Sequence, residues 1–222
     1  MATVVPYLAA GLVHGAPVLV IATAEHRQAF EAALPDDPAG LLAMRDADEL
    51  LDAISDRGRV DAAAFEQHVG GLVDELGARH PGSTIRAFGE MVDLLWQRGD
   101  REGALALEEL WNGLQRTRSV ALLCAYCVDV FDVDVQNGGL SDVFRAHTHA
   151  RPVRDTAKLS AALDQALSEV VGPSGAARVY LDVAHAVPRG SVPRAQAVLG
   201  WLCATDRATA VDVLARVRAH YA

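Results

Sequence analysis

Four short apolar runs, each separated from the next by helix-like sequence, constrain the fold of this chain most strongly. The first run, residues 17–22 (PVLVIA), is continuous and rich in β-branched residues, the pattern of a strand covered on both faces. The other runs are residues 40–45, 83–90 and 119–128. Helix-like patterns lie at 3–13, 23–34, 46–55, 61–78, 90–99 and 101–114. This alternation predicts an α/β fold in three layers, with a mostly parallel sheet between helices.

The character of the chain changes at Thr156, where strand patterns end. Helix-like runs follow at 157–171, 174–186, 192–204 and 206–221. We therefore expect two domains, an α/β domain over residues 1–155 and an all-helical region over 156–222. The helical region is predicted to pack on the first domain, to form a homodimer or to carry an output signal.

Charge and cysteine content narrow the classes of partner. The 222 residues carry a formal net charge of −9, which disfavours nucleic acid and anionic lipid as partners. The three cysteines form no even framework, which indicates a reducing cytoplasm. His14, Gly15 and Pro17 interrupt the apolar N-terminal stretch, so we expect no membrane span.

Candidate site residues gather where strands are expected to end, because parallel sheets bind ligands outside the carboxyl ends of their strands. These ends are Ala22-Thr23, Arg45-Asp46, Gly89-Glu90 and Tyr126-Cys127. A carboxylate at Glu90 is suited to hold a metal, polarise water or accept hydrogen bonds from a ligand. The structural alternative is that Glu90 caps the next helix or pairs with Arg86. Both interpretations stay open from the sequence.

A second group of candidates lies on the helix after this strand. Glu108, Trp111 and Asn112 stand at i, i+3 and i+4 and share one helical face. They fit the polar end of an apolar pocket, or a helix packed on the sheet.

Cysteine and histidine spacing gives no prediction of a metal site. If residues 119–128 are a strand, Cys124 and Cys127 point to opposite faces, which favours core packing over chelation. His26, His147 and His149 would need to converge with further ligands to bind a metal. Of these, His147 is retained as a pocket candidate.

The block at residues 85–126 closely resembles the MEDS domain, the sensory domain of DcmR-type regulators. The likeness extends over roughly residues 5–150. The matching motif positions are Arg86, Phe88, Gly89, Glu90, Met91, Val92, Leu94, Leu95, Trp96, Leu107, Glu108, Trp111, Asn112, Leu123, Cys124, Ala125 and Tyr126. The chain departs from the family pattern at Ala16-Pro17 and at Cys127, where the family commonly has a glutamate and a proline.

The resemblance implies a distant relation to RecA and KaiC nucleotide-binding domains, and therefore a P-loop after the first strand. Here that loop has no glycine and no Gly-Lys-Ser/Thr. Glu25 would stand where phosphate binds and would itself satisfy the helix dipole. We thus expect a degenerate P-loop without ATP hydrolysis, although Arg27 leaves an anion contact open. Its residues are Thr23, Glu25, His26 and Arg27.

The resemblance further implies a cytoplasmic, non-catalytic sensory protein without a cofactor or metal, active in signal transduction and transcription regulation. It would bind a small organic ligand and signal to a kinase, anti-sigma factor or transcription factor. The alternatives are a nucleotide-binding RecA/KaiC-like switch or ATPase with an altered P-loop, and a ligand-free scaffold. The expected ligand-binding residues are Arg86, Glu90, Glu108, Trp111, Asn112, Cys124, Tyr126 and His147.

Overall fold

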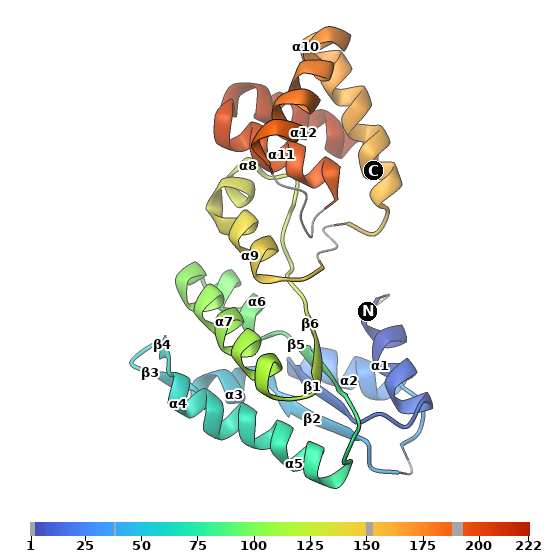
Figure 1. Cartoon of the computed structure of the whole chain (residues 1–222), viewed down its shortest axis with the longest axis vertical. Coiled ribbons are helices and arrows are strands. Elements are labelled where there is room, and N and C mark those ends of the chain that lie inside the picture. Colours follow the sequence, from blue (N-terminus) through green and yellow to red (C-terminus); the bar gives the residue numbers. More distant parts are fainter. Residues whose placement is uncertain (1–2, 38, 150–152, 188–192) are drawn as a thin grey trace. The chain divides into compact units, whose positions relative to one another are not determined.

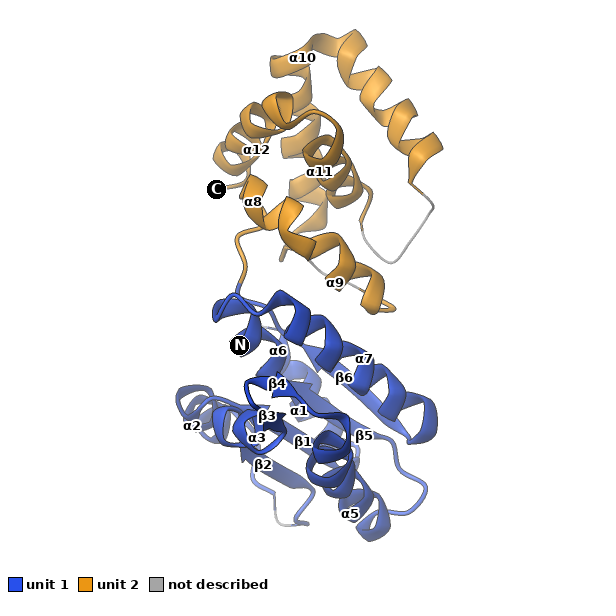
Figure 2. Ribbon diagram, turned by 90° about the vertical axis from the view of Figure 1, so that its left-hand side faces the viewer, with its two compact units in different colours: residues 1–127 blue, residues 128–222 orange. Residues whose placement is uncertain are grey.

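The computed structural model describes the whole chain except residues 1–2, 38, 150–152 and 188–192. The chain forms two compact units, unit 1 (Met1–Cys127) and unit 2 (Val128–Ala222), coloured separately in Figure 2. This division differs from the one expected from the sequence, which lay between residues 155 and 156. The compact units divide after Cys127, so residues 128–155 belong with the C-terminal helices. In the described ranges, no helix combines the length and the apolar character needed to cross a membrane.

Unit 1 is built on a four-stranded sheet in the order β2-β1-β5-β6, with every neighbouring pair parallel. The strands are β1 (Val18–Ala22), β2 (Leu42–Asp46), β5 (Ile85–Gly89) and β6 (Val120–Cys124), and they lie side by side in Figure 1. All five residues of β1 are buried, as its continuous apolar pattern predicts. The predicted mostly parallel sheet is therefore confirmed.

Helices cover both faces of this sheet. The first connection runs from β1 to β2 and the next returns past β1 to β5, so right-handed crossovers place their helices on opposite faces. One face packs α1 and α2 through Leu8 and Phe30 against Val20 and Phe88. The helices of unit 1 are α1 (Val4–Val13), α2 (Ala24–Ala33), α3 (Ala47–Ala53), α4 (Ala62–Phe65), α5 (Gly71–Arg79), α6 (Met91–Gln97) and α7 (Arg101–Thr117).

Two local features differ from the sequence expectation. A small antiparallel hairpin, β3 (Ser55–Asp56) and β4 (Arg59–Val60), follows α3. Its two turn residues, Arg57 and Gly58, both have positive φ, which a two-residue turn of this type requires. The helix expected over 61–78 is instead α4, a π-helical turn η1 (Glu66–Gly70) and α5.

Unit 2 is entirely helical in its described part. Leu163, Leu167, Val198, Leu199 and Val213 lie at the centre of its apolar core. Gly172, at φ 74°, interrupts the long helix directly before Pro173, at the break expected between 171 and 174. The start of the run expected at 192–204 lies outside the described residues. The elements are α8 (Val133–Val135), π-helical η2 (Gln136–Leu140), α9 (Ser141–Ala146), α10 (Thr156–Ala186), α11 (Arg194–Thr205) and α12 (Arg207–Tyr221).

Candidate functional site

Glu90 lies where parallel α/β sheets usually bind their ligands. It directly follows β5, and its backbone N–H donates to the carbonyl of Ile21 in β1 at 3.0 Å. The chain leaves β1 toward β2 on one side, while β5 pairs with β1 on the other. Such a reversal of strand order opens a crevice between the carboxyl ends of the two strands. The residue is only 7% exposed.

At this position the Glu90 carboxylate binds the loop after β1. Its Oε2 accepts the backbone N–H of Thr23 at 2.9 Å and faces the Thr23 hydroxyl at 3.4 Å. Its Oε1 lies 2.6 Å from Nδ1 of His26. We call these three residues the Glu90 latch. Because Thr23 is the N-cap of α2 and helix N-termini attract anions, the latch gives α2 an internal anion.

Neither structural alternative for Glu90 describes its side chain. Glu90 is the N-cap residue of α6, but its carboxylate makes no capping hydrogen bond there. Arg86 does not pair with it either. The Arg86 guanidinium donates to the backbone carbonyl of Tyr7 at 3.0 Å and lies 5.4 Å from the centre of the Tyr7 ring. Arg86 thus ties β5 to α1, away from the latch.

A second ion pair lies beside the latch at the end of β2. Arg27 donates to Asp46 at 2.7 Å, and Asp46 caps α3 by accepting the N–H groups of Asp48 and Glu49. The Glu49 N–H, and after it the Arg27 guanidinium, lower the pKa of Asp46. Arg27 is therefore occupied by a protein carboxylate. Glu25 is exposed in the first turn of α2.

The remaining unit 1 candidates face α7 on the other side of the sheet. Glu108 is 2% exposed, and its Oε1 accepts the Tyr126 hydroxyl at 2.7 Å. The Cys124 thiol donates to Oε2 of the same carboxylate at 3.8 Å. Burial, and secondly the nearby Glu108 charge, raise the pKa of both Cys124 and Tyr126. This arrangement keeps the thiol and the phenol protonated, as donors to Glu108.

Trp111 belongs to the core of unit 1. It is 1% exposed, and its ring meets Phe65 edge-on with the centroids 5.4 Å apart. A Cβ placed on Gly89 would lie 4.0 Å from the Trp111 ring, an ordinary van der Waals distance, so the indole packs over the end of β5 at Gly89. The packing interpretation of the helical face thus describes Trp111. Asn112 lies on the same helix, half-buried.

The sequence-predicted ligand residues therefore form two groups on opposite faces of the sheet. Glu90 contacts α2 on one face, whereas Glu108, Trp111, Cys124 and Tyr126 meet at α7 on the other. His147 belongs to unit 2, where it ends α9 with Nδ1 2.7 Å from the carbonyl of Val143.

The expectation of core packing was wrong for Cys127. β6 ends at Cys124, so strand alternation does not orient this pair. Cys127 is exposed, its N–H donates to Asp93 at 2.8 Å, and its carbonyl accepts Gln97 at 2.6 Å.

The three free thiols are expected to differ in alkylation rate. At pH 8, iodoacetamide should modify exposed Cys127 first, because burial raises the pKa of Cys203 to about 11 and that of Cys124 well above its usual value. We expect Cys127 to react at least about tenfold faster than Cys124, as measured by peptide mass spectrometry over time. Equal rates would show that Glu108 does not hold the Cys124 thiol, and Cys127→Ser should leave the other two rates unchanged.

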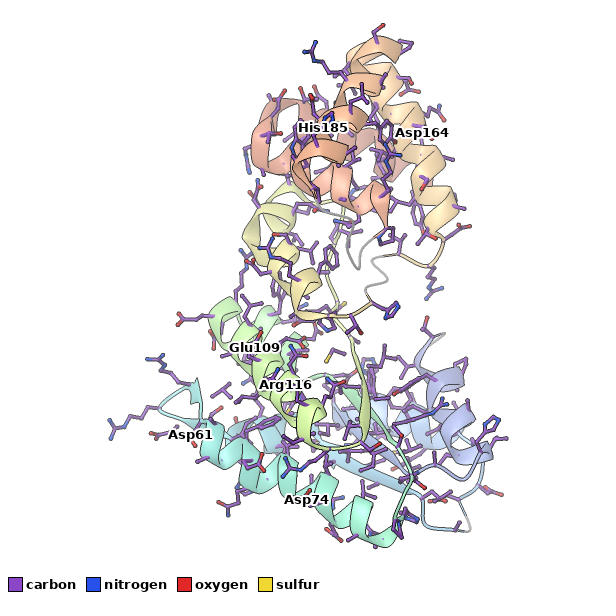
Figure 3. All side chains as sticks on the ribbon, viewed as in Figure 1. Asp61, Asp74, Glu109, Arg116, Asp164 and His185 are labelled. Carbon is purple, nitrogen blue, oxygen red and sulfur yellow. The ribbon has the colours of Figure 1, made fainter. Side chains whose placement is uncertain are left out.

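Sequence reasoning missed a groove of about 710 Å³ on the α7 side of unit 1. Phe65, Leu110 and Leu114 supply its apolar lining. Arg118 also lines the groove, where it forms ion pairs with Glu66 and, at 2.7 Å, with Asp74. Figure 3 labels Asp74 on α5 and Glu109 and Arg116 along α7, which also line the groove. In the sequence, the charged residues Asp74, Glu109 and Arg116 are typical of a solvent-exposed helix face, so no sequence pattern indicated the groove.

By contrast, the role of Asp46 could have been found. It stands at a predicted strand end, and the rule that singled out Glu90 applies to it equally.

The fold and site define an α/β protein in which Glu90 joins the carboxyl ends of β1 and β5, at the strand-order reversal, by hydrogen bonds to Thr23 and His26. The chain belongs to the MEDS family (MEthanogen/methylotroph, DcmR Sensory domain), whose model matches residues 1–148. This membership supports a sensory or regulatory role. The match spans unit 1 and continues 21 residues into unit 2 (128–148). No curated protein and no solved structure matches the chain.

Proposed function

We propose that this protein senses a small organic molecule without chemically converting it and passes the bound state to a regulatory protein. The single observation that carries the proposal is the sensory-domain match over residues 1–148. The partner would be a kinase, an anti-sigma factor or a transcription factor, and the site of action the cytoplasm. The ligand and the partner together would make the chain a switch in signal transduction.

The Glu90 latch supports a role without nucleotide hydrolysis. In a P-loop protein, a Gly-rich turn and a lysine hold phosphates at the N-terminus of the helix after the first strand. Here the equivalent loop carries neither, and the Glu90 carboxylate takes the Thr23 N–H that a phosphate would use. A phosphate entering this position would meet a fixed negative charge and would have to displace it. We infer that the loop is a degenerate P-loop.

The latch also provides a means of switching. It joins the end of β1, the start of α2 and the end of β5 through hydrogen bonds to one side chain. Glu108 does the same for α7 and the end of β6 through Tyr126 and Cys124. A ligand at this carboxyl edge of the sheet would exchange hydrogen bonds with one of the two carboxylates. It would shift the protein between two loop arrangements only if it binds one of them more tightly.

Thermal-shift measurements on the full chain test the proposal. A ligand at one hundred times its Kd stabilises by about 2.7 kcal/mol, which raises Tm by roughly 5–10 °C for a chain of this size. We expect such a rise with at least one compound of a panel of small uncharged and monoanionic organic molecules. Native mass spectrometry of the purified protein would identify a retained compound directly.

The rival function, a nucleotide-binding switch, gives the opposite pattern in the same assay. ATP or ADP with Mg²⁺ would then raise Tm by several degrees while the organic panel would not. Turnover of ATP that is lost in Glu90→Gln would contradict the proposal. If neither ligand class has an effect, the chain is better described as a ligand-free interaction protein.

A further inference from the structure

The last part of the family match is built into the C-terminal unit. The family model extends to residue 148, yet the compact unit containing the sheet ends at Cys127. The difference is residues 128–148, and we call the part of it that ends with α9, residues 128–146, the connecting segment. It begins four residues after β6 and contains α8, η2 and α9. Its contacts within unit 2 show what it is fitted to.

A buried pair of amides fixes the connecting segment to α11. Gln136 and Gln196 are 5% and 2% exposed. Nε2 of Gln196 donates to Oε1 of Gln136 at 2.9 Å, and Nε2 of Gln136 donates to the Val130 carbonyl at 2.5 Å. A buried hydrogen-bonded pair permits few alternative registers, so it specifies how the two elements dock.

Helix α12 holds the same segment from a second side. Arg207 donates to Asp134 at 2.7 Å and Arg218 to Asp129 at 2.5 Å. The rings of Phe131 and Tyr221 also pack together, with their centroids 5.5 Å apart. Each exposed ion pair contributes little free energy, but the two have the same polarity, acidic on the segment and basic on α12. Charge complementarity therefore favours one orientation of the connecting segment on α12, in addition to the contact with α11 that the amide pair specifies.

We propose that the connecting segment is the output surface of the sensory domain and that α11 and α12 of the same chain are its docked partner. The proposal rests on the proposed sensory function and names its receiver. The connecting segment continues directly from the end of β6, where Cys124 and Tyr126 bind Glu108. A rearrangement at the end of β6 is therefore transmitted to the connecting segment through the covalent backbone. The receiver is a pair of amphipathic helices with a buried amide and two arginines.

The docking is suited to release because it is incompletely satisfied. Within the part of the chain that the structure describes, Oε1 of Gln196 is buried and accepts no hydrogen bond. A buried polar atom without a partner lowers the stability of the arrangement that contains it. The free-energy difference between the docked and undocked arrangements of the connecting segment is therefore smaller than it would be if every buried polar atom were hydrogen-bonded. A change at the end of β6 can then alter the docked population.

Native-state hydrogen exchange on the full chain tests this proposal, with Glu90→Ala as the perturbation in unit 1. In wild type, the amides of 130–146 should open together with those of α11 and α12, and separately from β1 and β5. Glu90→Ala should change the exchange rates of both 130–146 and α11–α12 by about threefold or more. Glu90→Gln serves as the milder variant if the alanine variant does not fold.

Breaking the amide pair is the second arm. Gln196→Ala should speed exchange in 130–146 by about tenfold or more and should remove the effect of Glu90→Ala on α11–α12. The matched control is Gln165→Ala, which removes an exposed amide from α10 and should leave both unchanged. Exchange of 130–146 in step with β5, or a Glu90→Ala effect confined to unit 1, would overturn the proposal. Neither result would affect ligand-induced stabilisation, so the sensory function is tested independently.

Discussion

Replacing Trp111 with alanine is expected to lower the free energy of unfolding of unit 1 by about 3–5 kcal/mol. The indole is 1% exposed, meets Phe65 edge-on and packs over Gly89, so its removal leaves a large cavity between α7 and the sheet. Hydrogen exchange of the β1 and β5 amides measures this quantity for unit 1 separately from unit 2.

The matched control for Trp111 is an exposed neighbour on the same helix. Glu109→Ala should change the stability of unit 1 by no more than about 0.5 kcal/mol. A loss below about 1 kcal/mol for Trp111→Ala would mean that the indole lines an open pocket. The prediction thus decides between the two interpretations that the helical spacing of Glu108, Trp111 and Asn112 leaves open.

Replacing Glu90 with alanine should destabilise unit 1 by about 1–3 kcal/mol, because the Thr23 N–H loses a charged acceptor in a largely buried position. His26 adds less, since its side chain is 48% exposed and solvent screens its interaction with the carboxylate. Glu90→Gln keeps an acceptor oxygen and should fall between wild type and the alanine variant. Urea titration followed by hydrogen exchange at β1 gives the values.

An exposed glutamate on α2 controls for loss of charge. Glu31→Ala removes the same charge from the helix whose first turn the latch binds, without touching the latch, and should stay within about 0.5 kcal/mol of wild type. Equal effects of Glu31→Ala and Glu90→Ala would indicate that net charge, and not the hydrogen bond to Thr23, determines stability. An unchanged stability in Glu90→Ala would show that the latch is not formed.

The fold was largely predictable because the strands of a covered parallel sheet carry a strong apolar signal. Residues 17–22 and 119–128 contain β1 and β6, and the Gly172-Pro173 break in α10 follows from backbone chemistry. The β3–β4 hairpin was not predictable, since its strands have two residues each and Arg57 adopts a positive φ that the residue type does not favour.

The candidate site was predicted as a set of residues but not as an arrangement. The strand-end rule places Glu90 at the carboxyl end of β5, beside β1, and the structure has it there. Its partner Thr23 lies 67 positions earlier in the chain, so only the pairing of β1 with β5 brings the two together. The sequence motif also contains both Glu90 and Glu108. In the structure their side chains lie on opposite faces of the sheet, because Glu90 binds the start of α2 and Glu108 lies on α7. Side-chain contacts of this kind depend on tertiary packing that local patterns do not encode.

The most direct test of the account is a titration of the wild-type protein with ATP and Mg²⁺, followed by phosphorus NMR of the three phosphates. Because the Glu90 carboxylate occupies the anion position at the start of α2, the phosphate signals should keep the shifts and line widths of the free nucleotide. A saturable change in those signals that is altered by replacing Arg27 would contradict this account.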